Sequence, residues 1–458
     1  MNDKNPVKLG LTNLREVSSI SLDNCSISNI MLFSAFLQHF KGKSLSSISI
    51  NYNLLNLLSN HDYSDGSKRR KALYAIFSHL EKFRLKHLKV NIYSNLLEKE
   101  SIPNSTINVL ETVYHKLRFM NTLEYLNLEG GFHDYFVQQK KWYNLLGNYP
   151  KLSKIWSPNY EESEDELQIV RKMSNLKSVQ EILIVVEDKY SELTKKILQE
   201  STNAKILTLK LYPIKIQAAV NKELPLVHKR IPALLNSLKE FTNLRELAIC
   251  YPNSLYICAD HSKNVLNCDF LKFLPRLERL IILEHLRKHF SLFNMEDLGD
   301  YISKLGKLKH LHLQLDCTTE EFAKFLKSDS SHLSMLKYLN LCLNFNGKVR
   351  STENFSKWAK GLKNIRELFL ELYTRSISIE EYSNLLEGIS ELQKLKTLSF
   401  KCPNHSMNLD KKTSVVNSQM LSKLENLKRL EFELRDLPFE EREKVDNIIK
   451  DRESKYFP

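Results

Sequence analysis

A short apolar pattern recurs along most of the chain and limits the folds that it can adopt. The pattern is L-x-x-L-x-L, with other aliphatic or aromatic residues in place of some leucines, as in residues 308–313 (LKHLHL) and 336–341 (LKYLNL). Its last two apolar residues are two positions apart, so in a strand they point to one face, and the residue between them points to the other. One unit cannot bury its apolar face alone, whereas stacked units bury a continuous core. The repetition therefore predicts a stack of parallel strands.

Fourteen units carry this pattern, with varying fidelity. Their first apolar residues are Val17, Leu45, Leu85, Leu123, Leu152, Val179, Ala204, Leu244, Leu277, Leu308, Leu336, Ile365, Leu395 and Leu427. The mean spacing of about 31 to 32 residues leaves room for a strand, a turn and a returning helix in each unit. Segments of helical period lie between the predicted strands, at 31–40, 72–83, 107–117, 166–173, 320–326 and 379–389.

The repeat resembles that of the leucine-rich repeat proteins. Its first two units have the long form of the pattern, with Cys25 and Asn53 at the ninth position, where the family places a buried residue that bonds adjacent loops. The repeat length and the helical returns are similar to the ribonuclease-inhibitor-like branch. The resemblance implies an α/β leucine-rich-repeat solenoid of about fourteen irregular repeats, with a curved parallel sheet on the concave side and helices on the convex side.

The repeats occupy so much of the chain that we expect one domain over residues 1–458. Residues 1–16 are expected to form an N-terminal cap, residues 17–434 the repeats, and residues 435–458 a C-terminal capping helix. Five gaps between units exceed one turn and one helix: 56–84, 93–122, 212–243, 284–306 and 402–426. They are either inserted segments, which often carry recognition, or irregularity of the repeat.

Composition and motifs favour an intracellular protein that is not an enzyme. The seven cysteines are scattered without a C-x-x-C pair, which is typical of reduced thiols. The first residues form no secretory signal. The sequence also contains no run of 18 apolar residues, which a membrane-spanning helix would need. We therefore expect a cytoplasmic location, with the nucleus as the alternative. Phosphate-binding and catalytic signatures such as G-x-x-x-x-G-K-[ST] and G-x-S-x-G are absent from the sequence, so we expect no cofactor and no catalytic site.

Two segments, one with two histidines and one basic, could be functional sites, but each could also be ordinary solvated surface. His285 and His289 are spaced as zinc ligands on a helix can be, but they lack the accompanying glutamate and a clear third ligand, so we expect no metal site. Lys68, Arg69, Arg70 and Lys71 form a cluster that would suit nuclear import or phosphate contact if it is more than a solvated loop.

The strand pattern also names the residues of the concave face. In the middle units the outward positions are apolar and include Leu183, Val185, Ile281 and Leu283. Large exposed apolar patches usually mark partner sites, although residues 212–243 could instead fold over this band.

Later units place larger side chains on the same face. These are His312, Tyr338 and Phe369, and the last is flanked by Glu367 and Glu371. Aromatic residues are enriched at binding hot spots, but Phe369 could also pack against its neighbours on the sheet.

These features predict a scaffold that binds another protein, as a subunit or adaptor of a larger assembly. The net charge of +13 and the Lys68–Lys71 cluster leave RNA or nucleoprotein binding as the alternative. A third candidate function is that of the GTPase-activating solenoids of nuclear transport, which this chain resembles in its repeat type. An acidic tail and matching catalytic residues are missing from this sequence.

Overall fold

The computed structural model describes most of the repeat region. The described residues are 18–25, 33–35, 37, 45–53, 74–93, 104–130, 136, 139–157, 164–186, 192–211, 227–251, 266–284, 293–345, 348–349, 352–374, 376–402, 423–434, 443, 447 and 450. The predicted N-terminal cap, the Lys68–Lys71 cluster, His285, His289 and most of the predicted C-terminal helix lie outside them, as do the side chains of Cys25 and Asn53.

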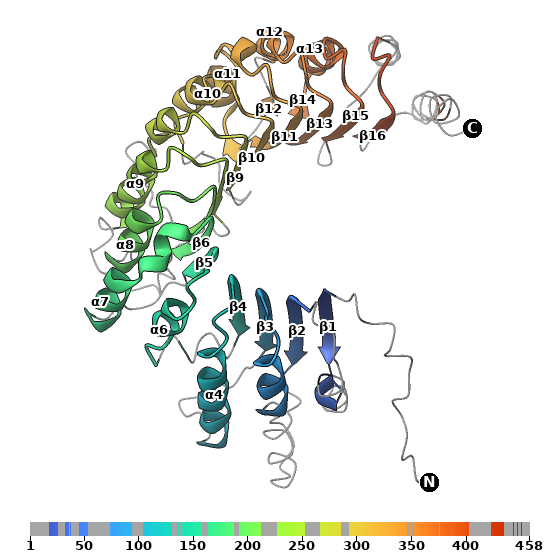
Figure 1. Ribbon diagram of the computed structural model, residues 1–458. Coiled ribbons are helices and arrows are strands. Elements are labelled where there is room, and N and C mark those ends of the chain that lie inside the picture. Colours follow the sequence, from blue (N-terminus) through green and yellow to red (C-terminus); the bar gives the residue numbers. More distant parts are fainter. Residues whose placement is uncertain are drawn as a thin grey trace, which may run out of the picture. The chain divides into compact units, whose positions relative to one another are not determined.

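The chain divides into two compact units. Unit 1 comprises Met1–Trp156, Tyr160–Ile182 and Ser191–Ser201, and unit 2 comprises Ser157–Asn159, Leu183–Tyr190 and Thr202–Pro458. Parallel strands with helices between them build both units, and the ribbon in Figure 1 is coloured along the sequence. The structure thus has the parallel-sheet repeat fold that the recurring apolar pattern predicts.

Unit 1 contains a four-stranded parallel sheet in the order β1-β2-β3-β4. The strands are β1 (Ser19–Cys25), β2 (Ser47–Asn53), β3 (His87–Tyr93) and β4 (Tyr125–Gly130). The short strand β5 (Lys154–Ser157) follows, and the helices are 74–80, α4 (Asn104–Leu117), α6 (Trp142–Gly147), α7 (Glu164–Lys172), η3 (Ser174–Ser178) and α8 (Glu192–Glu200). Ile48 pairs with Leu88, and Leu88 pairs with Leu126, so equivalent apolar residues form a buried column.

Most of the longer, ten-stranded parallel sheet belongs to unit 2. Its order is β16-β15-β13-β11-β10-β9-β8-β7-β6-β5, with β6 at Glu181–Val186. The strands that unit 2 adds to this sheet are β7 (Ile206–Leu211), β8 (Glu246–Tyr251), β9 (Arg279–Glu284), β10 (His310–Cys317), β11 (Tyr338–Phe345), β13 (Glu367–Tyr373), β15 (Thr397–Cys402) and β16 (Arg429–Leu434). Leu311 pairs with Leu339 and Leu313 with Leu341, as the repeated pattern predicts for neighbouring parallel strands.

Helices cover one side of the sheet in unit 2. They are α9 (Val227–Ser237), η4 (Leu238–Glu240), η5 (Asp269–Phe273), α10 (Met295–Ser303), α11 (Thr319–Phe325), η6 (Ser330–His332), α12 (Glu353–Gly361) and α13 (Ile379–Ser390). Figure 1 shows α10 to α13 on the same side of strands β10 to β15. Between the two layers the strand leucines meet aromatic side chains of the helices, and Phe325 and Trp358 lie 5.7 Å apart between ring centroids.

Two glycines allow the helices of this layer to approach one another. A Cβ atom on Gly299 of α10 would lie 2.7 Å from the Phe325 carbonyl oxygen, and one on Gly361 of α12 would lie 2.8 Å from the backbone of Ser330. Both distances are too short for a real carbon contact, so only glycine fits without a shift of the backbone. These positions set how closely successive repeats stack.

Within each unit, the same backbone hydrogen bonds link neighbouring repeats. We call the residue immediately before each strand its strand-entry residue. Its amide and the amide of the first strand residue both donate to the carbonyl of the preceding strand-entry residue, as Ser46 and Ser47 do to Ser18, and Lys337 and Tyr338 do to Lys309. The backbone at this position therefore makes the hydrogen bonds that stack the repeats, whereas these bonds place no requirement on the type of side chain.

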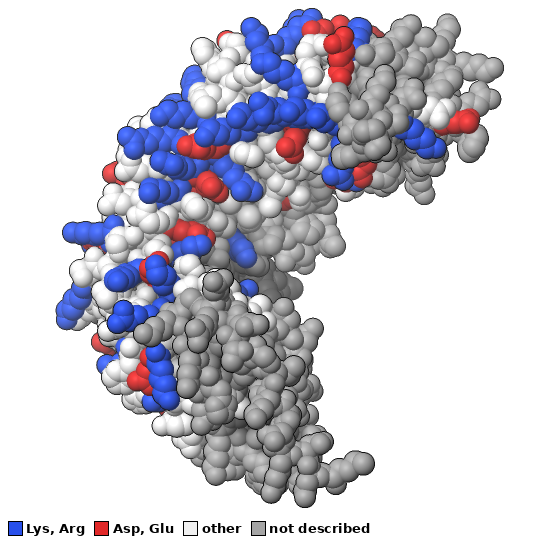
Figure 2. Space-filling view, turned by 45° about the vertical axis from the view of Figure 1, so that its right-hand side comes forward, with Lys and Arg blue, Asp and Glu red and all other residues white. Residues whose placement is uncertain are grey.

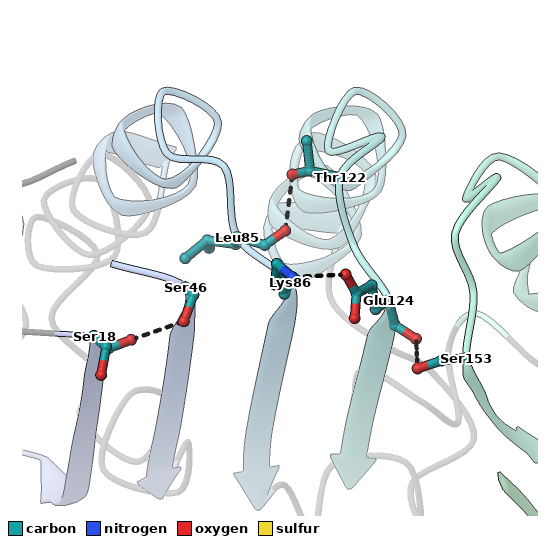
Figure 3. Close-up of polar contacts among 7 residues, drawn as sticks. All are labelled: Ser18, Ser46, Leu85, Lys86, Thr122, Glu124 and Ser153. Atoms are coloured by element: carbon teal, nitrogen blue, oxygen red, sulfur yellow. Dashed lines mark hydrogen bonds and ion pairs between the residues drawn. The ribbon is translucent and has the colours of Figure 1, made fainter. Parts of the chain in front are cut away.

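In unit 1 the strand-entry side chains make local contacts, which Figure 3 shows. Ser46 Oγ donates to the Ser18 carbonyl at 3.2 Å, and Ser153 Oγ donates to the Glu124 carbonyl at 3.1 Å. Lys86 and Glu124 form an ion pair of 3.1 Å. The strand-entry positions of unit 1 are thus occupied by hydroxyl groups and by a cation that is paired with its own counter-charge.

Among the described residues, several of the long gaps in the repeat pattern contain helices of the repeats. Residues 93–122 contain α4, and residues 284–306 contain α10. Residues 227–243 form α9 and η4, whose Leu234, Leu235 and Leu238 are buried in the helix layer. This part of the 212–243 segment therefore lies in the helix layer and not over the opposite face of the sheet. Residues 212–226 lie outside the described residues.

Candidate functional site

The strand residues that alternate with the core leucines form what we call the outward face of unit 2. The strand register aligns them in three rows. The first row is Ile206, Glu246, Arg279, His310, Tyr338, Glu367, Thr397 and Arg429; the second is Thr208, Ala248, Ile281, His312, Asn340, Phe369, Ser399 and Glu431; the third is Lys210, Cys250, Leu283, Gln314, Cys342, Glu371 and Lys401. Most of these side chains are half-buried, because each stands beside neighbours on a sheet without being enclosed.

Three rings lie next to one another on this face: His310 and Tyr338 are opposite each other, and Phe369 is a diagonal neighbour of Tyr338. The ring centroids of His310 and Tyr338 are 5.6 Å apart, and those of Tyr338 and Phe369 are 5.3 Å apart. Both distances and the tilted geometry suit favourable aromatic contact. Phe369 thus packs against a neighbour on the sheet, as the alternative interpretation of this residue predicts, yet Tyr338 and Phe369 both remain half-buried and keep accessible ring surface.

An apolar group lies beside the rings, on β8 and β9. Ala248 pairs with Ile281, and Cys250 pairs with Leu283, so the four side chains form a contiguous block. Ile281 in turn pairs with His312 on the other side. Leu183 and Val185 are half-buried on β6, at the alternating positions that the sequence predicts.

His312 pairs with Ile281 of the apolar block on one side and with Asn340 on the other. Burial lowers the pKa of its imidazole, and the positive charge of Arg279 lowers it further. Arg279 itself lies 3.8 Å from Glu246. The lowered pKa favours the neutral form of the His312 imidazole at physiological pH.

Glu371 flanks Phe369 on β13, as the alternation predicts, and makes hydrogen bonds within the sheet. The Tyr373 hydroxyl donates to its Oε1, and Cys342 Sγ donates to its Oε2 at 3.8 Å. Burial, and then the charge of Glu371, raise the pKa of the Cys342 thiol to about 12. These contacts have a simple cause, since residues two apart on one strand and opposite on the next share a face. Glu367, in contrast, is exposed.

A polar network at the carboxyl ends of β9 to β11 was not singled out from the sequence. Asn344 Nδ2 donates to Asp316 Oδ1 at 2.8 Å, and the Asp316 amide donates to Glu284 Oε2 at 3.2 Å. Asp316 and Asn344 are the ninth residues of the units that begin at Leu308 and Leu336. This is the position of the buried polar residue in leucine-rich repeats, so the repeat pattern could have identified Asp316 and Asn344 as members of a polar network. The network links adjacent repeats and is structural.

The far end of the outward face is charged. Lys401 Nζ lies 2.6 Å from Glu431 Oε1, and Ser399 Oγ donates to Glu431 Oε2 at 2.9 Å. These hydrogen bonds lower the pKa of the Glu431 carboxyl. The face therefore passes from apolar side chains on β8 and β9, through rings, to ion-paired side chains on β15 and β16.

The described residues offer no arrangement for metal chemistry. Among them, no group of three or more His, Cys, Asp or Glu side chains could hold a metal ion. The part of the chain that the structure describes also contains no helix that is long and apolar enough to cross a membrane.

Comparisons with known proteins give only distant likenesses. No protein-family model and no curated protein matches the chain. Among solved structures it is similar to the tropomodulin C-terminal domain of Caenorhabditis elegans, with 11% identity over 36% of this chain and 95% of that chain and a TM-score of 0.27. It is also similar to leiomodin-1 actin-binding site 2, with 15% identity over 35% of this chain and 90% of that chain and a TM-score of 0.28. Neither likeness assigns the chain to a family.

Proposed function

We propose that the protein is a non-enzymatic scaffold that binds another protein through the outward face of unit 2, inside the cell and within a larger assembly. We further propose that its repeats form a curved array of about fourteen units over residues 1–458, in the manner of the ribonuclease-inhibitor-like leucine-rich repeats. The observation that carries the proposal is the contiguous set of half-buried apolar and aromatic residues on a sheet face that the core does not use.

Such residues gain little for folding, because they stand on the side of the sheet away from the helices. Each Å² of apolar surface removed from water contributes roughly 25 cal/mol, so a partner that covered Ile281, Leu283, Tyr338 and Phe369 would stabilise the complex. Protein interfaces commonly combine an apolar and aromatic centre with a polar rim. The outward face has this arrangement, since the apolar block and the rings lead to exposed Glu367 and to the ion pair of Lys401 with Glu431.

The test compares Phe369→Ala with Phe273→Ala, which removes an aromatic side chain from the helix layer. Phe273 lies in η5 and is 44% exposed, so its loss should also leave the fold intact. The partner is first identified by affinity purification with the unaltered protein, and its affinity for the purified variants is then measured. We expect Phe369→Ala to weaken binding by about 1 kcal/mol or more, which is roughly fivefold, and Phe273→Ala to leave it unchanged.

Thermal unfolding of both variants separates contact from folding. Unchanged stability together with weakened binding would support the role of Phe369. Full affinity of Phe369→Ala at unchanged stability would remove this ring from the site, and the same result for Ile281→Ser and Leu283→Ser would exclude the outward face.

A further inference from the structure

The strand-entry residues of unit 2 form a row of cations. Among the eight that the structure describes, seven are Lys or Arg, and we call these seven the basic edge. They are Lys205, Arg245, Lys309, Lys337, Arg366, Lys396 and Lys428, and the eighth strand-entry residue is Glu278. Adjacent strands of a sheet are about 4.8 Å apart, so the row places one positive charge at almost every such step. Figure 2 shows many Lys and Arg side chains on the visible face, with fewer Asp and Glu side chains among them.

The fold does not require cations at this position. In unit 1 the same backbone hydrogen bonds are made by Ser18, Ser46, Ser153 and Gln180, among others. There the cation Lys86 is followed by its own partner, Glu124 (Figure 3). Neutral strand-entry residues therefore stack repeats as well as charged ones, and the charge of the basic edge needs another explanation.

Three neighbouring cations of the basic edge have no ion pair within the described part of unit 2. Lys309 Nζ lies 2.6 Å from Glu278 Oε2, and this hydrogen bond, together with the positive charges of Lys309, Arg245 and Lys307, lowers the pKa of the Glu278 carboxyl. Lys337, Arg366 and Lys396 are exposed, and the ion pairs found among the described residues do not include them. Like charges on neighbouring strands repel each other, so this stretch opposes folding unless an anion lies against it.

The turn residues beside the row indicate which kind of anion fits. Two positions before each strand-entry residue the chain has Asn203, Asn243, Arg276, Lys307, Met335, Asn364, Lys394 and Asn426, none of them aromatic. Single-stranded nucleic acids are held by aromatic stacking as well as by charge, and these turns provide no stacking side chain. Met335 is 41% exposed near Lys337 and offers apolar contact, which suits a polypeptide side chain better than a phosphate chain.

We propose that the basic edge docks an extended acidic segment of a partner protein, rich in Asp and Glu and with an apolar residue that meets Met335. The segment lies along the row, with its carboxylates against Lys337, Arg366 and Lys396. This surface is at the strand-entry edge of the sheet and shares no residue with the outward face, so the proposal does not depend on the function proposed for that face.

The experiment uses the full chain and a fluorescent twelve-residue peptide of alternating Glu and Asp with one central Leu. A matched peptide with Gln and Asn in place of the acids serves as the probe without charge. The edge variant combines Lys337→Gln, Arg366→Gln and Lys396→Gln, which copies the neutral Gln180 of unit 1. The control variant combines Lys324→Gln, Lys357→Gln and Lys360→Gln, three exposed residues on α11 and α12, and it loses the same net charge.

We expect the acidic peptide to bind at low salt, the neutral peptide not to bind, and added NaCl to weaken the complex. Because a surface ion pair contributes about a two- to threefold change in affinity, the edge variant should bind about tenfold more weakly and the control variant almost as well as the parent. Three results would overturn the proposal. They are no binding of the acidic peptide at low salt, equal losses in both variants, and tighter binding of a single- or double-stranded RNA of similar length that the edge variant abolishes.

Discussion

Cys342 shows how a thiol on the face of a sheet becomes unreactive. Its side chain is buried, although it lies in the same row as half-buried Gln314 and Glu371. Burial disfavours the thiolate, and the carboxylate of Glu371, which accepts from Sγ, disfavours it further. Cys402 has a pKa of about 12 as well, but through burial alone. The two thiols therefore form a natural comparison in which only one depends on a neighbouring charge.

This difference predicts a selective effect of Glu371→Gln on cysteine alkylation. The thiolate is the reactive form, so both thiols should react slowly with iodoacetamide at pH 8 in the native protein. Removal of the Glu371 charge lowers the pKa of Cys342, so its alkylation should become faster, most clearly between pH 9 and 11. The rate at Cys402 should not change. Timed alkylation followed by mass spectrometry of the peptides measures both rates, and an equal acceleration of the two would indicate general loosening of the fold instead.

Among the elements, β11 illustrates the two faces of one strand. Leu339 and Leu341 are buried against the helix layer, whereas Tyr338 and Asn340 alternate with them on the outward face. Leu339 also pairs with Leu311 and Leu368 on the neighbouring strands. Its side chain thus belongs to a column of leucines that runs through successive repeats.

We therefore predict that Leu339→Ala destabilises the protein by about 2 to 5 kcal/mol, because it removes buried apolar surface and leaves a cavity. Asn340→Ala, the next residue on the opposite face, should cost about 1 kcal/mol or less. Urea unfolding of both variants measures the difference. Equal effects would mean that β11 does not separate a core face from an outward face.

The strands and most helices could be predicted because each has a period that the sequence shows directly. Alternation over Leu311, Leu313, Leu339 and Leu341 gave the register of β10 and β11, and the helical periods at 107–117 and 379–389 correspond to α4 and α13. The two-residue strands β12 (Lys348–Val349) and β14 (Ser376–Ile377), which pair with each other, are too short to show any period.

The candidate site was predictable in position but not in its contacts. Alternation places Tyr338, Phe369 and Glu371 on one face, but it does not specify rotamers or diagonal neighbours. The ring contact of Tyr338 with Phe369 and the use of Glu371 by Cys342 and Tyr373 depend on side-chain directions across two strands. The Lys and Arg residues of the basic edge can be read in the sequence. That they form one row follows only from the backbone hydrogen bonds that align the strand-entry residues.

At the scale of the whole molecule, each unit has its own apolar core. Leu88 and Leu126 are fully buried in unit 1, and Leu311 and Leu339 are fully buried in unit 2. In repeat proteins each repeat contacts only its neighbours, so stability is approximately a sum of local terms. A cavity in one unit should then loosen that unit first.

We predict that Leu88→Ala and Leu339→Ala have separate effects on amide hydrogen exchange. Leu88→Ala should lower the protection of amides in β2 to β4 by about thirtyfold or more, since a loss of about 2 kcal/mol acts on the opening equilibrium of unit 1. Amides of β10 to β13 should keep their protection within about twofold. Leu339→Ala should produce the reverse pattern. Hydrogen exchange read by mass spectrometry of peptides resolves the two regions. If either substitution instead lowers protection equally in β2 to β4 and in β10 to β13, the two units open together, because the same opening event then exposes amides in both cores.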